Sequence, residues 1–208
     1  VTLFGFHFAS LDIRQNSKIH NKVFQNIFSN LGQFDSKFSN YFELSNKERI
    51  QLISEIQAEI SSELFDDEIT RQTIESIYAM KKIQENNGEL GSNRYIISNN
   101  ESTLNVLETL AMFRLCNWNQ PSVDIVPLFE SVDDLDQASS IMEELYTNTN
   151  YAEHLKRRGD KQTVMLGFSD GTKDGGYLTA NWGIFKAKEA ITSVSRKYGI
   201  KVIFFDGR

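Results

Sequence analysis

The sequence predicts an α/β fold built on a parallel sheet of about five strands, and two observations point to it. Two segments, VDIVPLF and KVIFF, are nearly continuous apolar runs, which is typical of strands that are covered on both faces. From Arg94 onward, strand-like segments alternate with amphipathic helical segments. This β-α-β-α-β-α-β order favours right-handed crossovers between parallel strands.

The predicted strands are short and spread over the whole chain. The third one contains Pro127, which removes a donor from the hydrogen-bond ladder and is unusual inside a sheet. Because the first strand lies at the start of the chain and the last one at its end, we expect the chain to be part of a longer protein. The five predicted strands are Leu3–Leu11, Arg94–Ser98, Val123–Phe129, Thr163–Phe168 and Lys201–Phe205.

Helical periodicity fills the intervals between these strands. Apolar residues recur at i, i+3 and i+4 between Leu104 and Phe113, and Ser102 is placed to cap that helix. The segments Ser131–Tyr146 and Tyr177–Tyr198 follow the same pattern, and Gly199 stands where a helix would stop. The stretch Gln33–Asn87 is polar and wholly helical in pattern. It is too long for a simple crossover, so we predict a helical insertion there.

Composition and charge exclude several classes of protein. The 208 residues carry 22 basic and 28 acidic side chains, which gives a net charge of −6 and argues against broad binding to nucleic acid or anionic membranes. No apolar stretch approaches the ~18 residues of a transmembrane helix, and the N-terminus lacks the features of a signal peptide. The single cysteine, Cys116, lies in an apolar run and is predicted to be a small core residue.

Charged residues follow or flank the predicted strand ends. Arg14 follows the first strand, Glu130 the third, Asp170 and Lys173 the fourth, and Arg208 the fifth. The carboxyl ends of parallel strands meet at one edge, where α/β proteins bind their ligands. Carboxylate oxygens suit Mg²⁺ or Mn²⁺, and arginines can hold phosphate or carboxylate groups with two hydrogen bonds. This set predicts a site for an anionic, metal-chelating substrate.

A simpler interpretation of the same residues stays open. An acid after a strand is commonly a helix N-cap or a solvated turn, so Asp170 could cap the helix that follows it. Arg14 could simply pair with Asp12 or with an adjacent strand-end acid. The run GTKDGG lacks the spacing of a phosphate-binding P-loop.

The remaining polar candidates are predicted to be structural or exposed. His7 lies in the first predicted strand, whereas His20 and His154 lie on polar helical patterns and are expected to be exposed. No two histidines have the spacing of a zinc site. The basic run Leu155–Arg158 is expected to be solvated and is too short to indicate nucleic-acid binding.

Four segments together resemble phosphoenolpyruvate carboxylase, in that family's order and with compatible spacing. They are FGFHFASLDIRQ, VDIVPLFESVDDL, VMLGFSDGTKDGGYLTANWGIFKAKEAI and YGIKVIFFDGR. The resemblance spans Phe4 to Arg208 and is weak only in the predicted insertion, Gln33–Asn87.

The resemblance implies a partial (β/α)8 barrel, with residues 1–208 forming part of one catalytic barrel domain and residues 33–87 inserted in it. It implies a cytoplasmic, homotetrameric enzyme that joins bicarbonate to phosphoenolpyruvate and yields oxaloacetate and phosphate with Mg²⁺ or Mn²⁺. The implied route passes through carboxyphosphate and an enolate, and the implied role is the supply of oxaloacetate to the tricarboxylic acid cycle. Neither nucleic acid nor a membrane is implied as a partner.

The resemblance also implies roles for the residues at the strand ends. Glu130 and Asp170 match the two metal carboxylates, and Arg14 matches an active-site arginine near the phosphate. Arg208 matches an arginine of the catalytic centre, and Lys173 a lysine associated with bicarbonate chemistry. The chain departs from the family in two places, because Asp206 stands where a histidine is usual and SDGTKDGG replaces SDSxKDAG.

Two alternatives stay open. One is another metal-dependent barrel enzyme that acts on phosphoenolpyruvate or pyruvate. The other is a non-catalytic structural half-barrel, and we expect the 208-residue chain to be inactive when isolated.

Overall fold

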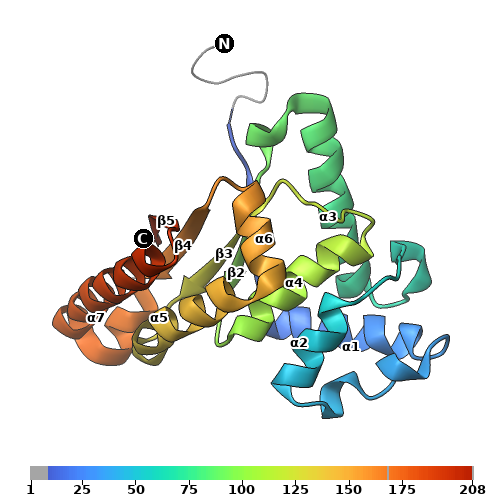
Figure 1. Ribbon diagram of the computed structural model, residues 1–208, viewed down its shortest axis with the longest axis horizontal. Coiled ribbons are helices and arrows are strands. Elements are labelled where there is room, and N and C mark those ends of the chain that lie inside the picture. The colour runs from blue at the N-terminus through green and yellow to red at the C-terminus, as the bar shows by residue number, and fades with distance from the viewer. Residues whose placement is uncertain (1–8, 168, 208) are drawn as a thin grey trace.

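The five strands form one parallel sheet, as the sequence predicts. The computed structural model of the chain describes residues 9–167 and 169–207, with the side chains of residues 169–175 excepted (Figure 1). The strands lie in sequence order, β1-β2-β3-β4-β5, and every neighbouring pair is parallel. Within the described residues, β1 and β5 each pair on one side only, so the sheet is not closed. Their bounds are β1 (Asp12–Asn16), β2 (Arg94–Ser98), β3 (Asp124–Phe129), β4 (Lys161–Gly167) and β5 (Lys201–Gly207).

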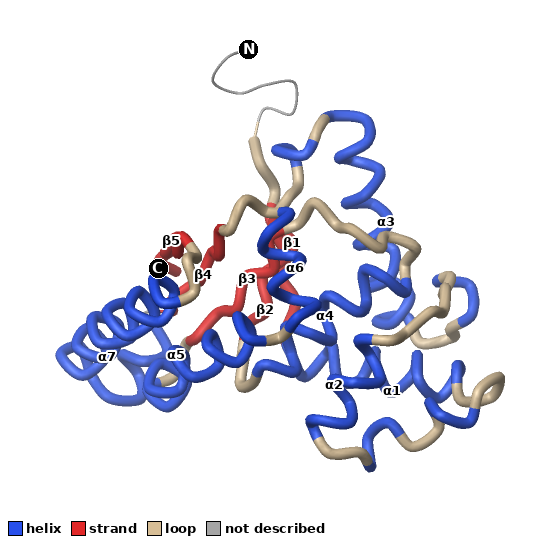
Figure 2. Tube along the Cα trace, viewed as in Figure 1, coloured by secondary structure: helices blue, strands red, loops and turns tan. Residues whose placement is uncertain are grey.

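Helices connect the strands and flank the sheet (Figure 2). The α-helices are α1 (Ser17–Leu31), α2 (Asn46–Ser54), α3 (Glu68–Asn87), α4 (Thr103–Leu115), α5 (Val132–Thr147), α6 (Thr149–Arg157) and α7 (Ser169–Lys197). Short 3-10 turns are η1 (Ser36–Phe38), η2 (Tyr41–Glu43), η3 (Ser62–Leu64) and η4 (Glu89–Gly91). Residues 33–87 hold α2, α3 and three of these turns, and no strand lies among them.

The first strand lies later than predicted. Of the predicted strand Leu3–Leu11, residues 1–8, including His7, lie outside the described part, and residues 9–11 are not extended into the sheet. The strand is Asp12–Asn16, so Arg14 lies inside it rather than after it. The prediction followed the apolar run, but this edge strand needs only one apolar contact, because Ile13 packs on the core while the opposite face stays polar.

The third strand tolerates Pro127 because of where its two ladders begin. Toward β2, the register runs through Ile97 opposite Pro127. Toward β4, pairing starts only at Leu128, which lies opposite Met165. The missing donor of the proline therefore falls where the ladder with β4 has not yet started.

The sheet has two apolar faces with separate clusters. Alternate residues of the strands, such as Tyr95, Ile97 and Ile125, join the main core with the helices. Residues of the opposite parity form a second cluster, which we call the inner face: Ile96, Val126, Leu128 and Met165. On β5, Ile203 and Phe205 continue the inner face, but each is 41% exposed because no further strand follows among the described residues.

Helix α4 is buried on nearly all sides. It lies between the sheet and the helices of residues 33–87, and Cys116 at its end is fully buried, as predicted. Glu108 is also fully buried and accepts a hydrogen bond from Tyr41 Oη at 2.7 Å. Burial raises the pKa of Glu108 to about 7, since desolvation disfavours the carboxylate.

Both helical histidines that the sequence placed at the surface are buried, so that prediction was wrong. His20 contacts Tyr95 Oη at 2.9 Å and Thr109 Oγ1 at 3.2 Å, and burial lowers its pKa to about 4. His154 is 1% exposed. The polar residues next to each histidine suggested an exposed position. The buried face of a helix can nevertheless carry a histidine as well as an apolar residue.

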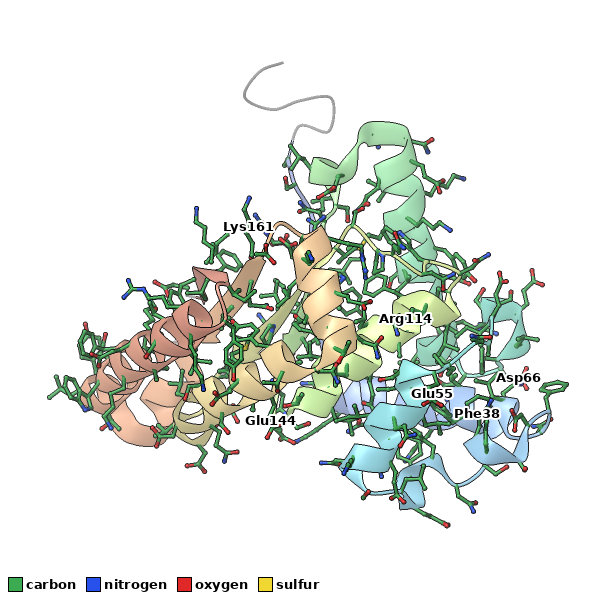
Figure 3. The ribbon with its side chains drawn as sticks, in the orientation of Figure 1. Phe38, Glu55, Asp66, Arg114, Glu144 and Lys161 are labelled. Atoms are coloured by element: carbon green, nitrogen blue, oxygen red, sulfur yellow. The ribbon has the colours of Figure 1, made fainter. Side chains whose placement is uncertain are left out.

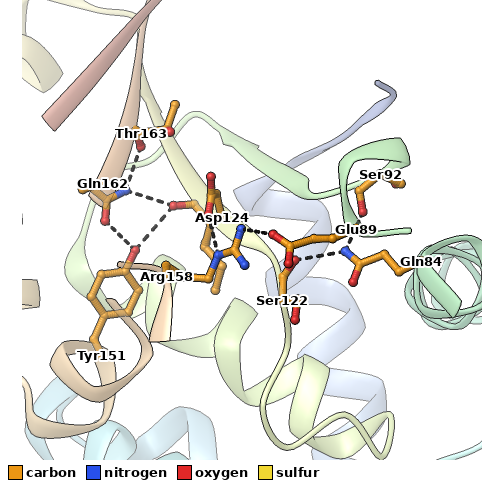
Figure 4. A network of polar contacts seen from close by, with 10 residues as sticks. Gln84, Glu89, Ser92, Ser122, Asp124, Tyr151, Arg158, Gln162 and Thr163 are labelled. Atoms are coloured by element: carbon orange, nitrogen blue, oxygen red, sulfur yellow. Dashed lines mark hydrogen bonds and ion pairs between the residues drawn. The ribbon is translucent and has the colours of Figure 1, made fainter. Parts of the chain in front are cut away.

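The amino edge of the sheet, where the strands begin, carries a closed polar network (Figure 4). Arg158 donates from Nε to Asp124 at 2.7 Å and pairs through Nη2 with Glu89 at 2.7 Å. Beside it, Gln162 accepts from Tyr151 Oη at 2.8 Å. The predicted solvation of Leu155–Arg158 was therefore wrong for Arg158, whose side chain is only 12% exposed.

Long side chains project from this same edge of the molecule. Lys161 is the first residue of β4 and is exposed there (Figure 3).

None of the described helices is both long enough and apolar enough to pass through a membrane.

Candidate active site

The carboxyl edge of the sheet brings Arg14 and Glu130 together. Arg14 lies on β1 opposite Ile96, and Glu130 directly follows β3, two residues after the inner-face residue Leu128. Arg14 Nη2 donates to Glu130 Oε1 at 2.9 Å. Arg14 and Glu130 therefore meet across an intervening strand, β2, in an ion pair of the kind that the simpler interpretation allows between Arg14 and a strand-end acid. The arginine side chain is 50% exposed and the glutamate 20% exposed, so both can reach a ligand.

A second donor holds the other oxygen of Glu130. The backbone N–H of Asn99, just after β2, donates to Glu130 Oε2 at 3.1 Å. Both carboxylate oxygens thus have a partner, one on β1 and one after β2.

The loop after β3 is short because helix α5 begins almost at once. Ser131 caps α5 by accepting from the backbone N–H of Asp134, and Asp134 accepts in return from Ser131 N at 3.0 Å. This capping box keeps Glu130 at the start of the helix, immediately beside the sheet.

Gly167 lets β4 approach Glu130 closely. A Cβ at this position would lie 2.9 Å from Glu130 Cγ and 3.2 Å from its Cα, both closer than side chains normally pack. A glycine at the end of β4 is therefore needed for the observed position of Glu130. Sequence reasoning did not assign Asn99 or Gly167 to the site. The available signals were a pair of asparagines in the turn after the second strand and a glycine at the end of an apolar strand.

Three predicted site residues are not placed at the level of side chains. Asp170 and Lys173 lie in the first part of α7, which follows β4 directly, but their side chains are outside the described part. Arg208 lies outside the described residues altogether. Gly176 breaks α7 with φ of 79°, so the first part and the long second part of this helix differ in direction.

The donor set at this edge fits a hard cation in part. The described residues contain no group of three or more histidine, cysteine, aspartate or glutamate side chains suited to a metal. Glu130 supplies one accessible carboxylate, and Mg²⁺ commonly uses only one or two protein carboxylates together with water and substrate oxygens. Glu130 therefore fits as one ligand of such an ion.

The side chain of Asp206 faces the helix layer. It lies within β5, opposite Leu166, and accepts from Lys188 Nζ of α7 at 2.8 Å. Its neighbours Phe205 and Gly207 have the parity of the inner face. In this structure the aspartate thus forms an ion pair with α7.

Comparisons with known proteins show the family of the chain. A model of the family described as phosphoenolpyruvate carboxylase matches residues 1–208. The chain is 36% identical to the phosphoenolpyruvate carboxylase of Nitrosomonas eutropha, over 100% of this chain and 23% of that relative. It is 34% identical to the one of Nitrosomonas europaea, over 99% and 23%, and 34% identical to the one of Corynebacterium diphtheriae, over 100% and 24%.

The chain spans about a quarter of the length of these curated relatives. The family match nevertheless covers every residue of the chain, including each strand that supports the Arg14–Glu130 pair. This chain belongs to the phosphoenolpyruvate carboxylase family.

Proposed function

We propose that the protein carrying this chain joins bicarbonate to phosphoenolpyruvate and releases oxaloacetate and phosphate. The observation that carries the proposal is the accessible Arg14–Glu130 pair at the carboxyl edge of a sheet that matches the phosphoenolpyruvate carboxylase family along its whole length. Ligands of parallel α/β folds bind at this edge.

The proposed site uses two carboxylates and two arginines. Glu130 and Asp170 would hold Mg²⁺ or Mn²⁺, and Arg14 and Arg208 would hold the phosphate of phosphoenolpyruvate. When bound, the divalent cation supplies Lewis-acid stabilisation of the negative charge on the enolate oxygen. Lys173 is proposed to assist bicarbonate, because its ammonium group can attract this anion.

In the proposed route, a bicarbonate oxygen attacks the phosphorus of phosphoenolpyruvate. The bond between phosphorus and the enol oxygen breaks, which gives carboxyphosphate and the enolate of pyruvate. Carboxyphosphate then breaks into CO₂ and phosphate, and the enolate carbon forms a bond to CO₂. Arg14 contributes charge and orientation to the phosphoryl group, for which its 50% exposed side chain is suited.

The resemblance supports further proposals about the whole protein. We propose a cytoplasmic homotetramer that supplies oxaloacetate to the tricarboxylic acid cycle. Light scattering after size-exclusion chromatography would test the tetramer. We also propose that the 208-residue chain alone has no catalytic activity, because its sheet is open within the described residues and Ile203 and Phe205 are exposed. Activity of the isolated chain above the blank would refute this last proposal.

The test of the activity is an oxaloacetate assay coupled to malate dehydrogenase. In the protein carrying this chain, Asp170→Asn should nearly abolish oxaloacetate formation and weaken Mn²⁺ binding. The control is Asp136→Asn, which removes the same charge from an exposed site on α5. Unchanged turnover of the Asp170 variant at saturating metal would contradict the proposal.

One further measurement separates the competing barrel enzymes. A carboxylase of this kind releases phosphate from phosphoenolpyruvate only when bicarbonate is present. Phosphate or pyruvate release that is independent of bicarbonate would favour another metal-dependent enzyme that acts on the same substrate.

A further inference from the structure

Asn99 has an unusual backbone conformation at the carboxyl edge. It follows β2 directly and has φ of 54°, in the left-handed region that few residues other than glycine adopt. Asparagine tolerates this region better than most residues, because its short polar side chain can bond locally.

This conformation directs the Asn99 backbone toward Glu130. The backbone N–H donates to Oε2 at 3.1 Å, while the guanidinium of Arg14 occupies Oε1 at 2.9 Å. Arg14 is long and half exposed, so its position can change when a ligand binds. The donor of the Asn99 bond belongs to the main chain, so it is the more rigid of the two contacts.

Three further hydrogen bonds secure the turn. Ser17, the first residue of α1, donates from Oγ to the Asn99 carbonyl at 2.6 Å and accepts from Asn99 Nδ2 at 3.3 Å. Asn99 Nδ2 also donates to Glu101 Oε1 at 2.9 Å. Ser17 is only 2% exposed, so the turn after β2 is tied to a buried point at the start of α1.

We propose that Asn99 is a positioning residue for Glu130, whose left-handed backbone fixes the direction in which this carboxylate meets a divalent cation. The inference rests on the proposed function, because it takes Glu130 to be a cation ligand. Hydrogen bonds from outer partners orient the carboxylates that bind metals, and their loss typically weakens metal binding about 10- to 100-fold.

The test compares two substitutions that separate backbone from side chain. Asn99→Gly keeps the left-handed backbone, its N–H and the bond from Ser17 Oγ to its carbonyl, but removes the two bonds that the Asn99 side chain donates to Ser17 and Glu101. Asn99→Val keeps a side chain but strongly disfavours the left-handed region, because valine is β-branched. Mn²⁺ binding to the protein carrying this chain is measured by electron paramagnetic resonance of the free ion, alongside kcat and KM.

We expect Asn99→Val to raise the Kd for Mn²⁺ about tenfold or more, and Asn99→Gly to keep it within about threefold. Unchanged binding in the valine variant would overturn the inference. So would equal losses in the two variants, because the effect would then come from the side-chain bonds. If the valine variant does not fold, Asn99→Ala replaces it, and alanine binding as tightly as glycine would overturn the inference.

A Glu130→Gln variant distinguishes failure of the inference from failure of the proposed site. If Glu130→Gln binds Mn²⁺ as tightly as the unmodified protein, Glu130 is not a ligand, and the proposed metal site fails together with the inference. If Glu130→Gln weakens binding while Asn99→Val does not, only the role of Asn99 is refuted.

Discussion

The two edges of the sheet differ in how far their arginines are buried and paired. At the amino edge, Arg158 is 12% exposed and bridges two carboxylates, Asp124 and Glu89. At the carboxyl edge, Arg14 is 50% exposed and has one carboxylate partner among the described side chains, Glu130. The first arginine is enclosed by the fold and paired with two carboxylates, whereas half of the second arginine's side chain is exposed to solvent. The comparison separates charges that serve stability from charges that are available to a ligand, as barrel enzymes generally do.

The largest expected effect tests the carboxyl edge. Glu130→Gln should lower kcat for oxaloacetate formation about 100-fold or more, because it removes a fixed charge from the site. The melting temperature should change little, since a partly exposed ion pair contributes at most about 1 kcal/mol. The assay is the coupled reaction with malate dehydrogenase. The control is Glu63→Gln on η3, at an exposed position. Equal turnover in the two variants would show that Glu130 is not part of the active site.

At the amino edge, the expected effect falls on stability. Arg158→Leu leaves Asp124 and Glu89 without their cation, and we expect a loss of about 2 kcal/mol, reduced from the value for fully buried pairs because both carboxylates are partly exposed. Hydrogen–deuterium exchange of peptides from β3 and β4 would report this loss as faster local opening.

The neighbouring Arg157 provides the matched control, because it is exposed on the same helix. Arg157→Leu should leave the exchange of β3 and β4 unchanged. Turnover per folded molecule should stay the same in both variants. If the two leucine variants exchange equally fast, the polar network at this edge does not stabilise the sheet.

A smaller effect is expected from crowding Glu130. Gly167→Ala places a Cβ 2.9 Å from Glu130 Cγ, so the carboxylate must shift, and we expect Mn²⁺ binding to weaken about tenfold. Electron paramagnetic resonance of free Mn²⁺ measures the affinity. In Gly183→Ala, the control on α7, the added Cβ meets only the flexible end of Leu135 at 3.4 Å. An unchanged affinity in Gly167→Ala would show that close approach does not hold Glu130.

The smallest expected effect is a dependence on pH at the amino edge. Burial lowers the pKa of His154 to about 4, and the nearby Arg157 and Arg158 add to this shift. Between pH 6.5 and 4 the unfolded chain binds a proton that the folded chain refuses, so stability is lost as the pH falls. At pH 5.5 this loss is about 1 kcal/mol.

His154→Leu removes this titration, so its melting temperature should fall less steeply from pH 7 to 5 than that of the unmodified protein. Thermal unfolding of both proteins across this range measures the difference. At pH 8 His154 is neutral in both the folded and the unfolded protein. The melting temperatures of the two proteins should then differ only by a constant amount that reflects packing. Parallel curves from pH 8 to 5 would mean that His154 does not contribute to the acid sensitivity.

The alternation of patterns predicted most of the fold. The apolar run in β3 identifies this strand because both of its faces are covered by other side chains. The run in β5 identifies that strand as well, although its inner-face residues Ile203 and Phe205 are each 41% exposed. The same criterion failed for β1, which is an edge strand with polar residues on one face, Arg14 among them. The pattern of apolar residues along the chain identifies strands that are buried. A strand that buries only one residue on one face has almost no apolar pattern.

The candidate site was predicted less completely than the fold. The residue types at the strand ends indicated a site with acids and arginines, and Arg14 and Glu130 do meet. Asn99 and Gly167 were not assigned to the site, because their roles depend on a contact of the backbone and on a distance to a residue far along the chain. His20, His154 and Arg158 were assigned to the surface, since a polar side chain carries no local mark of burial.

The sequence alone predicted strands that alternate with helices, a parallel sheet and, through a resemblance, the family, although the first strand lies later than predicted. These properties depend on periodicity and on motifs, both of which are local. Three-dimensional packing was needed to show that Arg158 is enclosed while Arg14 remains accessible, although both are arginines close to the sheet. The reason is physical: exposure and pairing are set by the register of neighbouring strands, which joins residues separated by 116 positions, as in Arg14 and Glu130.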